Sequence, residues 1–219
     1  MSDGPGIGLL EREKEIAAIA RLIAAAETGG GGALRLEGPP GIGKSRLLAA
    51  ARGAAEHAGL EVLSARASEL ESDFGYGIVR QLFEARLARA GAAERAALLR
   101  GAAALAEPVF IPAQAGDDGA EVSTPAVLHG LYWLCVGLAE RRPLLLCIDD
   151  LHWADRPSLR WLAYLLQRLE GLRVAVLAGV RPAESRHAAD LLAAVAGHPL
   201  VGTLAPRPLS EDAVARLIA

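Results

Sequence analysis

Apolar residues along this chain follow two patterns, helical spacing and short continuous runs. Within residues 9–26, apolar side chains at 16, 19, 20, 22 and 23 lie on one face of a helix. The glycines that follow Thr28, up to residue 32, cannot continue that helix and indicate a flexible linker. Short apolar segments then predict five strands, at residues 33–37, 60–66, 143–149, 172–180 and 199–204.

Helical patterns fill most of the intervals between these strands. They occupy residues 44–58, 76–90, 93–106, 125–141, 158–169 and 184–196, and Ser210 precedes a last one. Residues 107–124, rich in Pro, Gly and Asp, predict an exposed loop. The runs at 143–149 and 172–180 are typical of strands buried on both faces of a parallel sheet. Strands that alternate with helices therefore predict an α/β domain with a mostly parallel sheet.

Composition narrows the class of protein. The 219 residues are 52% hydrophobic and 22% charged, with a formal net charge of −3. These values exclude a disordered or collagen-like chain and argue against a DNA-binding domain, which is usually strongly basic. No signal-peptide pattern is visible, and charge interrupts each apolar stretch before about 18 residues, so we expect a cytoplasmic protein without membrane contact. Cys135 and Cys147 lie in apolar runs and are predicted to be small buried hydrophobes.

One segment between a predicted strand and a predicted helix has the pattern of a phosphate-binding loop. It fits G-x-x-x-x-G-K-[ST] and consists of Gly38, Pro39, Pro40, Gly41, Ile42, Gly43, Lys44 and Ser45. Glycines let successive N–H groups point at phosphate oxygens, and the following helix adds its positive end. Lys44 would reach the β- and γ-phosphates, and Ser45 would bind Mg²⁺. A tight Gly/Pro turn is the alternative.

The strand at 143–149 ends in two acids, as a Walker B strand does. Asp149 would hold Mg²⁺, largely through water, and Asp150 would orient or deprotonate the attacking water. Two acids that merely solvate a turn are the alternative, which loses weight beside a phosphate-binding loop. Arg181 follows the strand at 172–180, and there it would stabilise the γ-phosphate charge. His152, Trp153 and Asp155 match no known zinc spacing, which disfavours a metal site there.

With these three elements in order, the chain resembles the AAA-like ATPase domain of the STAND class of P-loop NTPases, as found in large LuxR-type transcriptional regulators of actinobacteria. The likeness covers nearly the whole chain. At residues 9–16 the family commonly has L-x-G-R-E-x-E-L, and this chain has Glu11 in place of Gly. The other matching segments are GPPGIGKSR at 38–46, residues 65–68 and 74–83, DDLHWAD at 149–155, and Arg181 with Pro182.

The resemblance implies a P-loop NTPase fold with a five-stranded parallel sheet in order 5-1-4-3-2, flanked by helices. Residues 1–33 would hold the N-terminal helix and the glycine-rich linker, and residues 34–219 the AAA-like ATPase domain. The family binds ATP with Mg²⁺ and uses it as a switch, often with slow hydrolysis. Its N-terminal motif lies near the adenine, so Arg12 and Glu13 join Arg46 as candidate nucleotide contacts.

Two departures from the family limit what it implies. Asp150 stands where many AAA proteins have Glu, and one fewer methylene would displace the attacking water and slow hydrolysis. The C-terminal lid, the helical repeats and the helix-turn-helix of such regulators are not recognisable in residues 1–219, so the chain resembles a truncated regulator. No direct DNA binding is expected from it.

The expected function is therefore an ATP-binding switch module of a signal-transduction or transcriptional regulator, with weak Mg²⁺-dependent ATPase activity. Its expected partners are ATP or ADP and the remainder of a multidomain regulator or a partner protein, with nucleotide-dependent oligomerisation. Two alternatives stay open: a nucleotide-binding regulatory module without useful hydrolysis, and a degenerate fragment that serves only in protein interaction. A small-molecule kinase is disfavoured, because the acidic segment 107–124 lacks the arginines of a kinase lid.

Overall fold

A single parallel sheet organises the molecule. The computed structural model describes residues 9–111, 125–181 and 188–218. The strands are β1 (Gly32–Glu37), β2 (Glu61–Arg66), β3 (Leu144–Asp149), β4 (Val174–Val180) and β5 (Val201–Leu204). They are ordered β2-β3-β4-β1-β5, with parallel pairing throughout. This confirms the predicted order 5-1-4-3-2, with the first strand inside the sheet.

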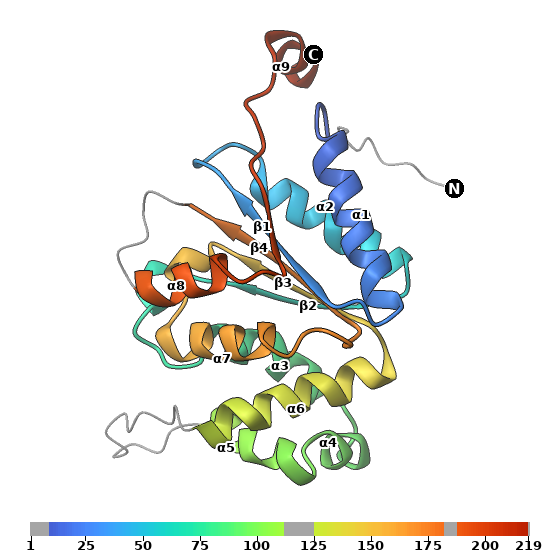
Figure 1. The fold of residues 1–219 in the computed structure, drawn as a ribbon, viewed down its shortest axis with the longest axis vertical. Helices are drawn as coiled ribbons and strands as arrows, with labels where there is room; N and C mark the ends of the chain where they lie inside the picture. The colour runs from blue at the N-terminus through green and yellow to red at the C-terminus, as the bar shows by residue number, and fades with distance from the viewer. Residues whose placement is uncertain (1–8, 112–124, 182–187, 219) are drawn as a thin grey trace.

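Helices cover both faces of this sheet (Figure 1). The helices are α1 (Glu13–Glu27), α2 (Lys44–His57), α3 (Gly77–Arg89), α4 (Ala92–Leu98), α5 (Glu107–Phe110), α6 (Pro125–Arg141), α7 (Arg156–Leu166), α8 (Ala189–Ala196) and α9 (Glu211–Ile218). Three short 3₁₀ turns are η1 (Glu69–Glu71), η2 (Gly101–Ala106) and η3 (Leu151–Trp153). Helices α1 and α2 lie on one face, and α3, α7 and α8 lie on the other, with α6 beyond them.

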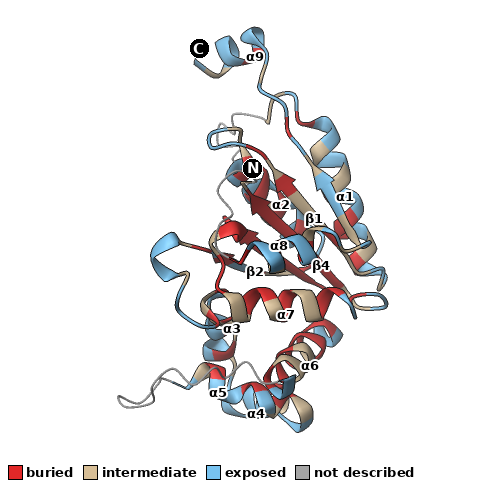
Figure 2. Ribbon diagram, turned by 60° about the vertical axis from the view of Figure 1, so that its left-hand side comes forward, coloured by how far each residue is buried: buried red, intermediate tan, exposed pale blue. Residues whose placement is uncertain are grey.

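The alternation of side chains along the central strands explains their continuous apolar runs. In β3, Leu145 and Cys147 pack with the α1–α2 layer, whereas Leu144, Leu146 and Ile148 pack in the larger core on the opposite face. Both sets are buried, and Figure 2 shows the buried colour running along the middle of the sheet. A strand covered on both faces has no polar side to show, as expected for an inner strand of a parallel sheet.

The structure corrects the predicted helix at 93–106. Gly101, with φ 61°, separates α4 from η2, so the segment is two short elements at an angle rather than one helix. Helix α6 packs closely on η2, and a Cβ at Gly130 would lie 2.5 Å from the backbone nitrogen of Ala106. The predicted loop at 107–124 begins instead with α5, and its residues 112–124 lie outside the described part. The same is true of residues 184–187 of the predicted helix at 184–196.

The glycine run between α1 and β1 is a close-packed connection rather than the expected flexible linker. Gly30 donates its N–H to the carbonyl of Ala25 at 2.8 Å, which ends the helix. A Cβ at Gly31 would lie 2.1 Å from the carbonyl oxygen of Leu169, in the turn that precedes β4. Glycines are therefore needed here, because two backbone segments are in contact. This contact fixes the position at which the chain passes from α1 into β1.

A hydrogen-bonded clasp joins the first described residues to the last helix. The carboxylate of Glu11 accepts hydrogen bonds from the Ser210 N–H at 2.9 Å and the Ser210 hydroxyl at 2.5 Å. Ser210 also caps α9, because its hydroxyl oxygen accepts from the N–H of Ala213 at 3.2 Å. Glu11 has φ 55°, a left-handed conformation that suits glycine better.

None of the described helices is long and apolar enough to cross a membrane.

Candidate phosphate and metal site

The loop from Gly38 to Gly43 leaves β1 at the carboxyl edge of the sheet and leads directly into α2. Two of its glycines have left-handed backbones, Gly41 with φ 80° and Gly43 with φ 103°. At both positions a Cβ would meet no atom within 4 Å, so the space in front of the loop is open. A curled backbone facing open space beside a helix N-terminus is the cradle that a phosphate group requires.

Lys44 is held by the same loop. Its ammonium donates hydrogen bonds to the carbonyls of Gly38 at 2.6 Å and Pro39 at 3.0 Å. The side chain is buried at 6% exposure, although a lysine ammonium is strongly hydrated when free. The buried charge is therefore positioned at the mouth of the cradle, where an incoming phosphate would add oxygen acceptors to it.

Ser45 and Asp149 form a ready-made pair for a small cation. The Ser45 hydroxyl donates to Oδ2 of Asp149 at 2.8 Å, across the gap between α2 and β3. Mg²⁺ binds oxygens at 2.0–2.1 Å in octahedral geometry, which places neighbouring ligands about 2.9 Å apart. The oxygen pair therefore has the separation that one octahedral ion demands, and the residues present fit Mg²⁺.

Asp150 has an unusual backbone and two cationic neighbours. Its φ and ψ are 52° and 38°, and its N–H donates to Oδ1 of Asp149 at 2.9 Å. Its carboxylate lies 3.3 Å from Nη2 of Arg66 and 3.4 Å from Nε of Arg181. The Asp150 side chain is only 10% exposed, so these two guanidinium groups compensate for the lost hydration of the carboxylate. The structure thus brings Arg181, predicted from sequence, next to Asp150.

Two further residues shape this edge of the sheet and were not identified from sequence. Arg66 ends β2 in register with Asp149, and strand register is invisible without the fold. Gly179 lies in β4, and a Cβ there would stand 2.8 Å from Oδ1 of Asp149 and 3.4 Å from Leu48. A glycine inside an apolar strand is itself a sign of close approach, and this signal was available.

The candidate nucleotide contacts at the N-terminal motif line two neighbouring grooves, and Arg12 lines both of them. Arg12 is buried and donates to the carbonyl of Ile42 at 3.1 Å, within the phosphate-binding loop. Arg12 and Arg46 line a groove of about 450 Å³ together with Leu9, Leu10, Pro40, Gly41, Ile42, Gly43, Pro208, Leu209, Val214 and Leu217. Glu13 lines a neighbouring groove instead, with Thr203 and Arg207.

The acids and rings that follow Asp150 have structural contacts. Oδ1 of Asp155 accepts from the N–H of Ser158 and from the N–H of Tyr76, both at 2.8 Å, so it caps α7 and holds the start of α3. His152 is fully buried, with its ring 5.3 Å from that of Trp153. Within the described residues, no three His, Cys, Asp or Glu side chains gather in a metal-binding group.

The two cysteines are buried as predicted, and burial raises the pKa of the Cys135 thiol to about 12 and that of Cys147 to about 11.

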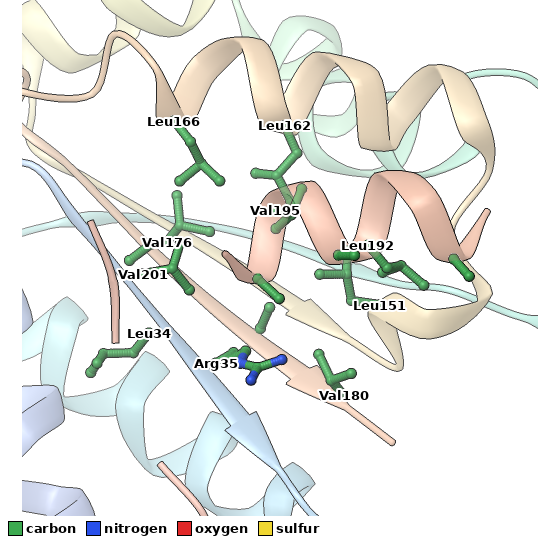
Figure 3. A pocket seen from close by; sticks show the side chains of 15 residues that line it. Leu34, Arg35, Leu151, Leu162, Leu166, Val176, Val180, Leu192, Val195 and Val201 are labelled. Carbon is green, nitrogen blue, oxygen red and sulfur yellow. The ribbon is translucent and has the colours of Figure 1, made fainter. Parts of the chain in front are cut away.

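An apolar hollow of about 200 Å³ lies on the opposite face of the sheet from α2, between β4 and the helices α7 and α8. Figure 3 shows Leu162, Leu166, Leu192 and Val195 pointing towards it. No residue of the phosphate-binding loop lines this hollow, so it is separate from the candidate site.

Comparison with known proteins agrees with this fold. No curated protein matches the chain. The structure of Cdc6p from Pyrobaculum aerophilum is similar over 100% of this chain and 51% of its own, at 13% identity and a TM-score of 0.56. The Walker-type ATPase PABY2304 of Pyrococcus abyssi is similar over 96% of this chain and 57% of its own, at 15% identity and a TM-score of 0.52. At such identities the likeness shows the fold alone, and the chain spans little more than half the length of these structures.

The family match extends through the motifs described above. Residues 8–177 match the AAA ATPase domain, a range that contains the phosphate-binding loop and both acids at the end of β3. Membership of this family implies nucleotide binding and usually Mg²⁺. The chain belongs to the AAA ATPase domain family.

Proposed function

We propose that this chain binds ATP with Mg²⁺ at the carboxyl edge of the sheet and hydrolyses it slowly, as a switch module of a signal-transduction or transcriptional regulator. One observation carries the proposal: the phosphate-binding Lys44, the Ser45–Asp149 pair and Asp150 adjoin one another, although they come from sequence segments about a hundred residues apart. The DDLHWAD segment at 149–155, which resembles that of LuxR-type regulators, supports the regulatory part of the proposal.

Two regions of the site would receive the two ends of the nucleotide. The triphosphate would lie along the open face of the loop, with its terminal oxygens towards Lys44. The base would enter the groove of about 450 Å³ that Arg12 lines, between the loop and α9. That groove has an apolar majority with a few convergent polar groups, the usual character of a small-molecule site.

The chemistry then divides among the side chains of this edge. Ser45 and Asp149 would hold Mg²⁺, which would supply neutralisation of the phosphate charge. Asp150 would accept a hydrogen bond from the attacking water and orient it towards the terminal phosphorus. Arg181, whose Nε lies 3.4 Å from the Asp150 carboxylate, would stabilise charge that develops on the γ-phosphate.

A second function, nucleotide binding without useful turnover, is favoured by the contacts of Asp150. Its carboxylate contacts Arg66 at 3.3 Å and Arg181 at 3.4 Å, so a water molecule would share it with two guanidinium groups. The two functions differ only in the rate of phosphate release.

The test compares nucleotide binding and phosphate release in three variants of the whole chain. Lys44→Ala is expected to abolish the rise in melting temperature caused by MgATP, and Lys14→Ala, which removes the exposed second lysine, to leave it unchanged. Asp150→Asn is expected to keep the melting shift and to lower phosphate release about a hundredfold, because it removes a general base.

Each outcome separates the candidate functions. Phosphate release that is equal in the wild type and Lys44→Ala would refute the ATPase. A melting shift without release above background would support binding alone. The absence of any shift with ATP or ADP would favour a fragment that serves only in protein interaction.

A further inference from the structure

A second polar pocket opens beside the Ser45–Asp149 pair, on the side away from the groove that Arg12 lines. It measures about 400 Å³ and lies between α2, the edge strand β2 and the start of α3. Its lining residues are Ser45, Leu48, Arg52, Ser64, Ala65, Arg66, Gln81, Cys147 and Asp149. Because Ser45 and Asp149 belong to both, the pocket is continuous with the proposed metal site.

The position of β2 at the edge of the sheet explains why the pocket is open. Ser64 and Arg66 stand in register with Cys147 and Asp149 of β3. Cys147 is buried beneath α2, whereas Ser64 and Arg66 are exposed. Strand β2 therefore presents polar side chains on a surface that α2 leaves uncovered, next to the reacting centre.

The charges and donors of this pocket suit an oxyanion. Arg52 and Arg66 bring two guanidinium groups. Mg²⁺ would neutralise the carboxylate of Asp149, and Arg66 shares the carboxylate of Asp150 with Arg181. Arg52 approaches the thiol of Cys147, which is buried at the floor of the pocket. The oxygen of Gln81 accepts the Arg66 N–H at 2.8 Å, which leaves its NH₂ group and the Ser64 hydroxyl to serve a ligand.

We propose that this pocket binds inorganic phosphate, held between Arg52 and Arg66, as the site that the hydrolysis product occupies after it leaves the γ-position. The identity of the ion as product rests on the proposed function, in which water and ATP give ADP and phosphate; the anion site itself rests on the pocket. Guanidinium forks match phosphate oxygens in geometry as well as charge. Product phosphate would thus pass from Lys44 to Arg52 without leaving the sheet edge.

The experiment titrates inorganic phosphate into the whole chain saturated with ADP and Mg²⁺, followed by calorimetry or by ³¹P resonance. Arg52→Ala, which leaves Asp150 and the Ser45–Asp149 pair in place, is expected to weaken phosphate binding about tenfold, the value of one charge-assisted contact. Arg21→Ala removes the same charge from the exposed face of α1 and is expected to change binding less than twofold. Sulfate at equal ionic strength should compete, and chloride should not.

A second variant keeps the test decisive if Arg52→Ala fails to fold. Ser64→Asp places a carboxylate on an exposed position of β2 and is expected to weaken phosphate binding at least as much, with an unchanged melting temperature. The titration is repeated without nucleotide in Lys44→Ala. Phosphate binding that persists there and depends on Arg52 supports the pocket, even where ATP hydrolysis is absent and the proposed function fails.

Three results would overturn the proposal. Equal weakening by Arg52→Ala and Arg21→Ala would show only general attraction. Loss of phosphate binding in Lys44→Ala, with full binding in Arg52→Ala and Ser64→Asp, would place the ion on the phosphate-binding loop alone. Tighter binding of phenyl phosphate than of inorganic phosphate would assign the pocket to a phosphorylated partner instead of the product.

Discussion

Gly179 shows how a single missing side chain sets the geometry of the site. It is the last residue but one of β4, and a Cβ there would crowd the carboxylate of Asp149. A Cβ at 2.8 Å from that oxygen is closer than van der Waals contact permits, and Leu48 blocks the other side at 3.4 Å. Any side chain at 179 must therefore displace Asp149 from Ser45.

Gly179→Ala is accordingly expected to lower MgATP hydrolysis roughly tenfold to a hundredfold, because small displacements at a reacting centre are costly. The loss should be greatest at low Mg²⁺ and partly restored by a higher Mg²⁺ concentration. Gly137→Ala is the matched control, since a Cβ there meets nothing within 4 Å; inside α6 it should raise stability by up to about 1 kcal/mol. Unchanged Mg²⁺ dependence in Gly179→Ala would contradict this account.

At the scale of residues, the sequence predicts which residue types stand at the candidate site, but it does not predict which side chains they contact. The phosphate-binding loop, Asp149 and Arg181 were predicted from local patterns, because each pattern is contiguous with its strand. Arg66 was missed as a neighbour of Asp150, because that contact depends on the pairing of β2 with β3, 84 residues later in the chain. The left-handed backbone of Asp150 is likewise set by the turn into η3 and has no local signature.

At the scale of elements, Asp155 ties two helices to one carboxylate. Its side chain caps α7 through Ser158 and also accepts from the N–H groups of Tyr76 at 2.8 Å and Ile78 at 3.4 Å, at the start of α3. Tyr76 has φ 62°, so the chain enters α3 from a left-handed residue that these bonds hold in place. Asp155, for which the sequence disfavours a metal role, thus joins the β2–α3 and β3–α7 connections.

Asp155→Ala is expected to lower the free energy of unfolding by about 3 kcal/mol, since it removes a helix cap and leaves buried N–H groups unpaired. Urea denaturation followed by circular dichroism measures this. Asp190→Ala provides the control, because Asp190 pairs with Arg156 on the surface at 2.9 Å and an exposed ion pair contributes little to stability. Similar losses in the two variants would show that Asp155 is not a special cap.

The elements that deviate from prediction do so at glycines, Gly101 and Gly31. Periodicity locates the strands and the long helices because their buried faces repeat, as the cores on the two faces show. It does not reveal that Gly101 divides the segment 93–106, nor that Gly31 presses on Leu169. Gly101 is favoured because its φ of 61° suits glycine, whereas Gly31 is required by its contact with a backbone segment distant in sequence.

For the whole molecule, the Glu11–Ser210 clasp is a contact that depends on pH. The hydrogen bonds from Ser210, and secondarily the nearby arginines, lower the pKa of Glu11 below its ordinary 4.5. A lowered pKa means that the clasp is fully present above pH 4.5 and is lost as pH falls through the folded-state pKa. The left-handed Glu11, where related motifs have Gly, is held in that conformation by the same contact.

The hydrogen-exchange protection of the α9 amides is therefore expected to be constant above pH 4.5 and to fall at lower pH, with the sheet amides unaffected in that range. Glu11→Gln retains the shape of the side chain but cannot titrate, so its α9 protection should be lower at neutral pH and flat with pH. A fall in α9 protection of equal size in Glu11→Gln would exclude Glu11 as the titrating group.

The clasp also determines how the molecule responds to mechanical load. It joins two residues 199 positions apart, so that nearly the whole described chain lies within the loop that it closes. Tension on residues outside that loop reaches Glu11 and Ser210 first, and the sheet bears load only after they part. Since Leu9, Leu10 and α9 line the groove proposed for the base, a nucleotide would bridge the two sides of this joint. A nucleotide bound in the groove would then raise the force needed to unfold the molecule when the ends of the chain are pulled.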